Sequence, residues 1–536
     1  MKPDKLFELL GDINGEDVKA SEEYVSRKKN TIKYLWSALG VAAVIIMAVI
    51  GLKIWKSGQP VNVPGSEISD IGDESNINLP DIDTDPTPVP TTDPLPVTDV
   101  DIDHLPIEID GYWEEIVTPG IGGIKAVYPK SYSEGMSAAE FYMSDASTAW
   151  YTEYFNNLGV SRPYAEESYS YCLAVMENIL KSDMENTVCS PINTYVALAM
   201  VAEITEGESR QQILDALGVP DIETLRTRIN AIWKSNYIDN PDLKCVLANS
   251  IWLNGNEKFD EHTLTLLAGY YHVSSYYGDP ENPEMEKALQ EWINENTDGL
   301  LKDYVGDIQL TPDLIFDIVS TINYKAMWYE EFDESLNTEE TFHGVKGDTI
   351  VTMMHSDFAS DSVCLTDKFT AINLSTTNSG RMYIYLPNNG YDVNDLLSDP
   401  DVLAYASYSS EWDWRFEHII NPIVHLTLPK FKVTGETDLI EMMKSMGITD
   451  VFDPVLSDFS PLATIRNDIY LQTATHSAVV EIDEEGITGA AYTELPFGMG
   501  GPGPEDEMDI VINRPFVFVI TGMDGSVLFS GAVRNI

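Results

Sequence analysis

The side chains best able to act as nucleophiles or metal ligands are few and scattered. The four cysteines form no CxxC pair, and the eight histidines form no HExxH or comparable ligand spacing, so no metal site is expected. Two cysteines lie in apolar, strand-like runs, which favours buried free thiols, with a disulfide or a catalytic thiol as the alternatives. The cysteines are Cys172, Cys189, Cys245 and Cys364.

Common catalytic motifs are also absent from the sequence. There is no GxSxG nucleophile elbow, no phosphate-binding GxxxxGK[ST] loop and no GxGxxG after a strand. The glycine-rich run GMGGPGP at 498–504 leads into EDEMD and would repel phosphate. Carboxylate pairs are so frequent that any one of them indicates only solvated surface. Nothing in these patterns argues for an enzyme, and a hydrolase is the alternative that the absence of motifs leaves open.

The charge of the chain excludes one class of partner. It has 87 acidic and 32 basic residues, a formal net charge of -55. Such a charge makes binding to nucleic acid or to anionic lipid headgroups unfavourable.

The apolar stretch Tyr34–Leu52 carries no charge over its nineteen residues. At about 1.5 Å per residue it spans about 28 Å, which matches a bilayer core. A buried core helix and a cleaved signal peptide are the alternatives. We expect a retained membrane helix over 34–55, because aromatic residues stand at both ends and no A-x-A site follows.

Basic residues set the expected orientation of this helix. Arg27, Lys28, Lys29 and Lys33 precede it, which predicts a cytoplasmic head at 1–33 and everything after the helix outside the cell. From Gln59 to Leu105 there are eleven acidic residues, eight prolines and no Lys or Arg. Residues 56–105 are thus an expected extended spacer that reaches at most about 145 Å.

The remainder, 106–536, is an expected ectodomain, with an N-terminal extension at 106–163 and a core from about 164. Helical patterns such as YSYCLAVMENIL (169–180) prevail early, and strand patterns such as RMYIYLP (381–387) and PFVFVITG (515–522) prevail late. The two are mixed without regular βαβ alternation. This predicts an α+β fold with antiparallel or mixed sheets.

Nine stretches of the ectodomain resemble, in order, the sequence motifs of the serpin family. The first, NTVCSPINTYVALAMVAEITEGESRQQILDALG (186–218), is similar to the family's opening signature. The others are LANSIWLNG (247–255), WINENTDGLLKD (292–303), YKAMW (324–328), VTMM (351–354), LPKFKV (428–433), MGITDVFDP (446–454), THSAVVEIDEEG (475–486) and RPFVFVI (514–520).

The resemblance implies a fold of three sheets and eight or nine helices with an exposed reactive-centre loop near the C-terminus. In the family, a target serine protease attacks this loop and forms an acyl-enzyme. The cleaved loop then inserts into the largest sheet as a new strand and distorts the protease. The resemblance thus implies a suicide substrate that is a monomer, without catalytic residues or cofactors.

The expected hinge of this loop begins at Glu484. The alternation of side chains from Ile487 onward suits insertion, because one face would carry only small or apolar residues and Thr493. An ordinary half-buried strand is the alternative. Ile487 stands where the family usually has Thr or Ser, Tyr492 where it prefers a small residue, and Pro496 lacks an N–H. The hinge residues are Glu484, Glu485, Gly486, Ile487, Thr488, Gly489, Ala490 and Ala491.

The family's usual interval from the hinge places the scissile bond near Gly500. Glycine offers no side chain to a specificity pocket, so Met499–Gly500 is the preferred bond and Phe497 a weaker choice. Met499 would suit elastase-like, chymotrypsin-like or subtilisin-like enzymes.

The resemblance assigns two further sites. Ser190 and His476 match a polar cluster that controls opening of the main sheet, and Ser320 stands where the family usually has Asn in that cluster. Trp328 matches the tryptophan beside the point where the loop enters. For Trp328 and His476, an ordinary core role is compatible with this one.

The sequence therefore predicts a membrane-anchored inhibitor of serine proteases on the outer face of a bacterial cell. Two alternatives remain open at this point. The ectodomain could be a noninhibitory binding or adhesion module, or it could be a sensor of extracellular proteases that signals through the anchor.

Overall fold

The computed structural model describes only part of the chain, and all of that part lies in the second of two compact units, Met1–Glu108 and Ile109–Ile536. The expected head, membrane helix and spacer lie outside it. No helix among the described residues is long and apolar enough to cross a membrane. The described ranges are 112–118, 121–128, 145–239, 244–306, 308–359, 363–377, 380–407, 419–420, 422–463, 468–487 and 506–536.

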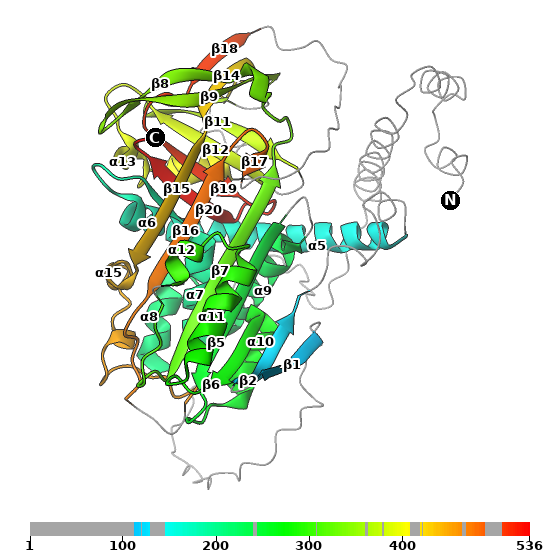
Figure 1. Cartoon of the computed structure of the whole chain (residues 1–536), viewed down its shortest axis with the longest axis vertical. Helices are drawn as coiled ribbons and strands as arrows, with labels where there is room; N and C mark the ends of the chain where they lie inside the picture. Colours follow the sequence, from blue (N-terminus) through cyan, green and yellow to red (C-terminus); the bar gives the residue numbers. More distant parts are fainter. Residues whose placement is uncertain are drawn as a thin grey trace, which may run out of the picture. The chain divides into compact units, whose positions relative to one another are not determined.

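Three β-sheets organise the described residues (Figure 1). The largest has nine strands in the order β1-β2-β6-β5-β7-β17-β16-β15, with β4 paired to β5. All its pairs are antiparallel except β5 with β6. The strands are β1 (Tyr112–Thr118), β2 (Ile121–Val127), β4 (Ile238–Asp239), β5 (Lys244–Asn254), β6 (Val273–Gly278), β7 (Phe316–Met327), β15 (Phe431–Asp438), β16 (Thr475–Ile482) and β17 (Gly486–Ile487).

The second sheet has seven strands in the order β13-β10-β11-β12-β19-β20-β3, and the third has four in the order β18-β14-β9-β8. In the third sheet β18 runs parallel to β14. These strands are β3 (Thr187–Cys189), β8 (Thr338–Gly344), β9 (Gly347–Ala359), β10 (Val363–Leu365), β11 (Phe369–Thr376), β12 (Gly380–Pro387), β13 (Ile419–Ile420), β14 (Ile423–Pro429), β18 (Glu507–Val511), β19 (Phe516–Thr521) and β20 (Val527–Val533).

Within the described part the structure has eleven α-helices rather than eight or nine, of which eight have at least seven residues. The extra three are short turns of helix at loops, which sequence periodicity cannot register. The helices are α5 (Asp145–Glu167), α6 (Tyr169–Leu180), α7 (Pro191–Glu203), α8 (Gly207–Leu217), α9 (Ile222–Asn236), α10 (Glu261–Tyr271), α11 (Pro283–Asn296), α12 (Lys302–Val305), α13 (Val393–Leu396), α14 (Pro400–Ala406) and α15 (Ile440–Ser445).

The predicted α+β class and the three antiparallel or mixed sheets are confirmed: the seven-stranded sheet is antiparallel, and each of the other two contains one parallel pair. The expected helix at 169–180 is α6, and the expected strands at 381–387 and 515–522 are β12 and β19. The two strands β1 and β2, which belong to the expected extension, join the edge of the largest sheet through β6.

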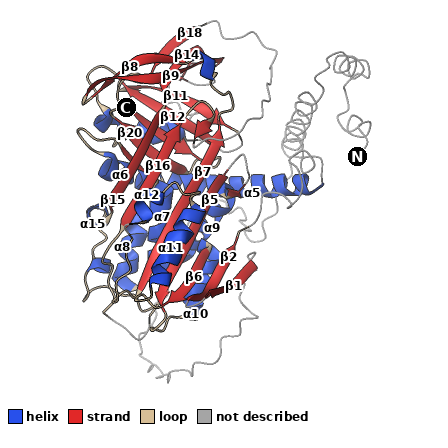
Figure 2. Cartoon of the chain, viewed as in Figure 1, coloured by secondary structure: helices blue, strands red, loops and turns tan. Residues whose placement is uncertain are grey.

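Helices cover both faces of the largest sheet, and β5 illustrates the result. Every residue of β5 after Lys244 is buried. Val246, Ala248 and Trp252 pack in one cluster with side chains of α11, which Figure 2 shows in front of the strands. Ile251 and Leu253 face the other side, in the cluster that contains α7, α8 and α9. Both faces of the strand are apolar because both are covered.

The centre of the largest sheet is incomplete in the described part. Strands β7 and β16 are neighbours in strand order, but both pair with the two-residue strand β17 rather than with each other. β17 lies at one end of them (Figure 1). Along the rest of their length the edges of β7 and β16 that face each other carry no strand pairing among the described residues.

Candidate functional site

The chain leaves β16 through a tight turn at the expected hinge. The carboxylate of Asp483 accepts hydrogen bonds from the backbone N–H groups of Glu485 and Gly486, at 3.0 and 3.1 Å. The backbone N–H of Asp483 donates to the carbonyl of Gly486 at 3.2 Å. An aspartate that accepts from the following backbone is a common way to close a turn. The turn directs the chain back between β16 and β7.

Trp328 fastens this turn to the end of β7. Its indole Nε1 donates to the carbonyl of Asp483 at 2.8 Å, and its backbone N–H donates to the carbonyl of Glu485 at 3.0 Å. The side chain is 2% exposed and packs edge-on against Phe332. Trp328 therefore lies where the sequence placed it, beside the start of the expected insert, and it is also part of the core.

Two side chains from neighbouring segments, Lys430 and Asn337, hold the carboxylate of Glu484 in place. Its carboxylate forms an ion pair with Lys430 at 2.6 Å and accepts a hydrogen bond from the amide of Asn337. Burial raises the pKa of Glu484, but the hydrogen bonds from Lys430 and Asn337 outweigh it and leave the pKa below its ordinary value. Glu484 thus stays ionised and anchors the proximal end of the hinge.

Gly486 begins β17, and no other residue would fit there. A Cβ at this position would lie 2.2 Å from the carbonyl oxygen of Ala326 and 2.8 Å from the Cα of Met327, both backbone atoms of β7. The next residue, Ile487, is 1% exposed and pairs with Ala326 on one side and Ile482 on the other. The start of the expected insert is therefore seated in the sheet.

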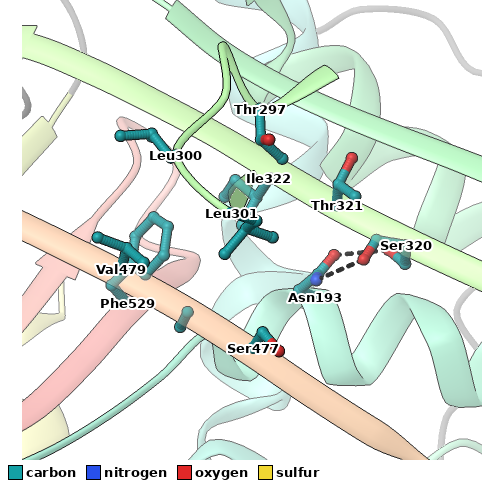
Figure 3. Close-up of a pocket in the computed structure, with 11 residues that line it drawn as sticks. Asn193, Thr297, Leu300, Leu301, Ser320, Thr321, Ile322, Ser477, Val479 and Phe529 are labelled. Atoms are coloured by element: carbon teal, nitrogen blue, oxygen red, sulfur yellow. Dashed lines mark hydrogen bonds between the residues drawn. The ribbon is translucent and has the colours of Figure 1, made fainter. Parts of the chain in front are cut away.

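A cavity lies beyond β17 between β7 and β16 (Figure 3). Its empty volume, including the part open to solvent, is about 330 Å³. Polar groups from α7, β7 and β16 line one part, and apolar side chains from the segment after α11 and from β20 line the other. The lining residues are Asn193, Thr297, Leu300, Leu301, Ser320, Thr321, Ile322, Ser477, Ala478, Val479 and Phe529.

The expected polar cluster begins with Ser190 and His476. The backbone N–H of Ser190 donates to Nε2 of His476 at 2.9 Å, which joins the start of α7 to β16. The hydroxyl of Ser190 caps α7 by accepting from the backbone N–H of Asn193 at 3.3 Å. His476 is buried, and burial lowers its pKa to about 4.

Ser320 bonds to different partners from those that the sequence grouped with it. Its hydroxyl lies 2.6 Å from Oδ1 of Asn193 and 2.7 Å from Oδ1 of Asn249. The amide of Asn193 donates to the carbonyl of Ser320 at 2.9 Å, and the amide of Asn249 donates to the carbonyl of Tyr271 at 2.8 Å. Within the described part of the chain, the hydrogen bonds lead from Ser320 through Asn193 and Ser190 to His476.

The sequence-based prediction included neither asparagine, although the sequence carries a signal for each. Asn193 and Thr194 interrupt the apolar residues of SPINTYVALAM, and Asn249 and Ser250 interrupt those of LANSIWL. A buried amide needs hydrogen-bond partners, so such an interruption points to a polar partner across the core.

Several expected site residues fall outside the described part of the chain. They are Thr488, Gly489, Ala490 and Ala491 of the hinge, and Met499 and Gly500 of the scissile bond.

The four cysteines are free and buried, which confirms the expectation of buried thiols. Burial raises the pKa of each of them. No group of three or more potential metal ligands occurs among the described residues.

Comparison with known proteins gives the same family. The family model "Serpin (serine protease inhibitor)" matches residues 166–536, more than half of the chain. The chain belongs to the serpin family. Serpins are protease inhibitors and not enzymes, in agreement with the absence of catalytic motifs from the sequence.

The matches to individual relatives span most of each relative's length. An uncharacterized serpin-like protein of Methanosarcina acetivorans is 26% identical over 390 residues, which are 71% of this chain and 88% of that protein. Antichymotrypsin-2 of Bombyx mori is 27% identical over 360 residues, 65% of this chain and 91% of that protein. The native-state structure of the thermophilic serpin tengpin matches with a TM-score of 0.60 at 21% identity, over 69% of this chain and 93% of that one.

Proposed function

We propose that this serpin is a suicide-substrate inhibitor of serine proteases, displayed on the outer face of a bacterial cell membrane. The observation that supports the proposal is the position of β17. Gly486 and Ile487 already lie between β7 and β16, and the edges of these two strands beyond them have no partner strand in the described part. A loop that continued from Ile487 would extend β17 along the cavity.

The sequence after Ile487 suits that path. Side chains alternate across a strand, so residues 489, 491, 493 and 495 would share the face of Ile487. They are Gly, Ala, Thr and Leu, all small or apolar apart from one hydroxyl. Ile487 is itself buried, although it replaces the Thr or Ser that is usual in the family.

We propose Met499–Gly500 as the bond that the protease attacks. An unbranched apolar side chain fits medium apolar pockets, as in elastase-like, chymotrypsin-like or subtilisin-like enzymes. The name of the Bombyx mori relative, antichymotrypsin-2, supports a protease of this kind.

A protease panel tests the proposal directly. The full chain would be incubated with chymotrypsin, elastase, subtilisin and trypsin. We expect a complex that survives SDS and a loss of protease activity with at least one of the first three, and a released fragment that begins at Gly500. Cleavage of the chain with full protease activity remaining would favour a noninhibitory module or a sensor instead.

A matched pair of substitutions makes the test specific for strand insertion. Ala491→Glu would place an ionised carboxylate on the same face as the buried Ile487, whereas Thr488→Glu would place it on the opposite face, between the half-buried Lys325 and Glu481. Because burial of an unpaired charge costs several kcal/mol, we expect Ala491→Glu to reduce the yield of complex at least about tenfold and turn the chain into a substrate. Thr488→Glu should inhibit like the parent chain. Equal effects of the two would contradict insertion in this register.

Display on the membrane is a separate part of the proposal, supported by the uncharged stretch 34–52, the basic residues before it and the acidic spacer after it. Protease added to intact cells should release the inhibitor domain and leave the head and helix with the membrane. Recovery of the whole chain in the culture medium would rule out an anchor.

A further inference from the structure

Three consecutive apolar residues lie exposed on a turn that follows α15. They are Pro454, Val455 and Leu456, and we call them the apolar tip. Val455 is 86% exposed and Leu456 is 58% exposed. Single exposed apolar side chains are common on protein surfaces, but a run of three is unfavourable in water unless it has a function. The exposure of the apolar tip therefore points to a partner that covers it.

Hydrogen bonds on both sides of the apolar tip fix the turn that carries it. The carboxylate of Asp453 accepts from the backbone N–H groups of Val455 and Leu456, at 2.8 and 3.3 Å. After the tip, the backbone N–H of Asp458 donates to the hydroxyl of Ser209 in α8 at 3.1 Å. Because the turn is already ordered, a partner that binds the tip loses little free energy in ordering it.

The apolar tip lies at the end of the largest sheet that is away from β17. Phe459, in the same loop as the tip, packs against Phe316, the first residue of β7, with ring centroids 5.6 Å apart. Figure 1 shows the orange segment after α15 at this end, where β7 begins. β17 pairs with the other end of β7, at Ala326 and Met327.

The length of the loop would bring the attacked bond to the end of the sheet that carries the tip. Ile487 lies opposite Ala326, and an inserted antiparallel strand passes one residue of β7 for each residue of its own. Phe497 would therefore come opposite Phe316, and Met499 would lie just beyond the start of β7. At about 3.3 Å per residue, Met499 would then be about 40 Å from Ile487.

We propose that the apolar tip is a docking surface for the acylated protease after the loop has inserted. In the acyl-enzyme, the serine oxygen of the protease has formed an ester with the carbonyl carbon of Met499, and the amine of Gly500 has left with the proton of that serine. Insertion brings this ester to the end of the sheet where Val455 and Leu456 are exposed. The inference rests on the proposed function and adds a second contact between the chain and its target.

Contact with the apolar tip should lengthen the life of the complex. Water hydrolyses the ester and frees the protease only while the catalytic groups of the protease hold their active arrangement. Each apolar side chain that the protease covers stabilises the docked state, so a docked protease spends less time in the active arrangement than one that moves freely on its ester. The tip thus acts on release of the protease and not on formation of the complex.

The test compares release of the protease from the double variant Val455→Ser/Leu456→Ser and from the parent chain. Complex is formed with the protease of the panel that gives the highest yield and is then purified, and the return of protease activity is followed. We expect complex formation at the parental rate but release about tenfold faster, since two side chains lose an apolar contact. Val455→Ile/Leu456→Met keeps the tip apolar and should release the protease at the parental rate.

Val160→Ser/Ile350→Ser is the matched control. It also replaces two exposed apolar side chains, 55% and 63% exposed, but on α5 and on β9 of the third sheet. Release should stay within about twofold of the parental rate. All three double variants should unfold at the parental temperature, because none of the replaced side chains is buried.

Other outcomes would overturn the docking surface. Release at the parental rate from Val455→Ser/Leu456→Ser would do so, and so would slower complex formation with unchanged release, which would place the tip in the first encounter. A dimer of the parent chain in sedimentation velocity that this variant abolishes would assign the tip to a second copy instead. A parent chain that forms no complex defeats the proposed function itself, whereas complexes of equal lifetime defeat only the docking surface.

Discussion

At the scale of single residues, His476 makes the polar cluster sensitive to pH. Its Nε2 accepts the backbone N–H of Ser190, so this nitrogen cannot carry a proton without losing the bond. No solvent reaches the ring to stabilise the charged form, and burial lowers the pKa to about 4 from an ordinary value of about 6.5. Acid should therefore loosen the contact between α7 and β16.

The sign of the pH effect follows from this shift. Between about pH 6.5 and pH 4 the unfolded chain binds the proton and the folded chain does not, so the stability contributed by neutral His476 is present above pH 6.5 and lost as the pH falls. We expect a loss of about 2 kcal/mol between pH 7 and pH 5 from this residue. His476→Gln, which keeps an acceptor, should lose about 2 kcal/mol less unfolding free energy than the parent chain between pH 7 and pH 5 in urea titrations.

A second buried histidine also contributes to the pH dependence of unfolding, so the slope of unfolding free energy against pH must be compared between His476→Gln and the parent chain. Burial also lowers the pKa of His272, to about 3, so the parent chain should lose more stability in acid than His476 alone explains. An unchanged slope in His476→Gln would contradict the assignment.

A residue can be placed from the sequence where one side chain meets a fixed backbone requirement, whereas partnerships between distant residues cannot. The position of Gly486 follows from the family pattern, and the structure supplies its reason, a backbone contact that admits no Cβ. The bonds of Ser320 to Asn193 and Asn249 could not be predicted. They depend on how three segments, separated in sequence by up to 127 residues, come together in space.

At the scale of elements, the hairpin of β1 and β2 adds two strands to the largest sheet. β2 pairs with β6, and the chain then brings Tyr128 against the rings of Trp233 and Tyr237, with centroids 5.5 and 5.3 Å away. The hydroxyl of Tyr128 donates to the carbonyl of His272 at 3.1 Å and accepts from the N–H of Asn249. The segment before the family match therefore contacts β5, the strand that pairs with β7.

Removal of this hydroxyl should weaken the fold measurably. Tyr128→Phe keeps the ring but leaves the N–H of Asn249 and the carbonyl of His272 without this partner. We expect a loss of about 1 to 2 kcal/mol of unfolding free energy in urea. Tyr391→Phe, at a side chain that is 41% exposed, is the control and should change it by less than about 0.5 kcal/mol. Equal losses of unfolding free energy in Tyr128→Phe and Tyr391→Phe would mean that the hydroxyl of Tyr128 does not stabilise the sheet.

Element-level prediction depended on strong periodicity. The strands β12 and β19 could be predicted because their residues are β-branched, aromatic or aliphatic. The stretch 423–433 looks continuous, yet the structure divides it at Lys430 into β14 and β15, which belong to different sheets. β2 has two adjacent glycines, which are rare in strands. Gly123 is needed there because a Cβ would lie 2.2 Å from the carbonyl oxygen of Ser275.

At the scale of the whole molecule, charge should control how quickly a protease is met. The net charge of -55 attracts a positively charged protease over distances that salt screens, with a Debye length of about 10 Å at 0.1 M. Under the proposed function, we expect the association rate with a basic protease to fall about tenfold between 20 and 200 mM NaCl. Progress curves of protease activity would measure it. The same protease with acetylated lysines should lose most of this salt dependence, and a flat profile for both would contradict steering.

At this scale the head, membrane helix and spacer stay predictions from length, charge and apolar runs, because they lie outside the described residues. The incomplete centre of the largest sheet was not predictable. The sequences of β7 and β16 are compatible with direct pairing, and only their spacing in the structure shows β17 between them.

The burial of all four cysteines has a practical consequence for experiments on this serpin. Every native thiol lies beneath the surface with a raised pKa, so maleimide dyes should react with the folded chain very slowly. A cysteine introduced into an exposed position would then be the single labelled site. Fluorescent probes could report movement of the loop in a chain that keeps all of its own cysteines.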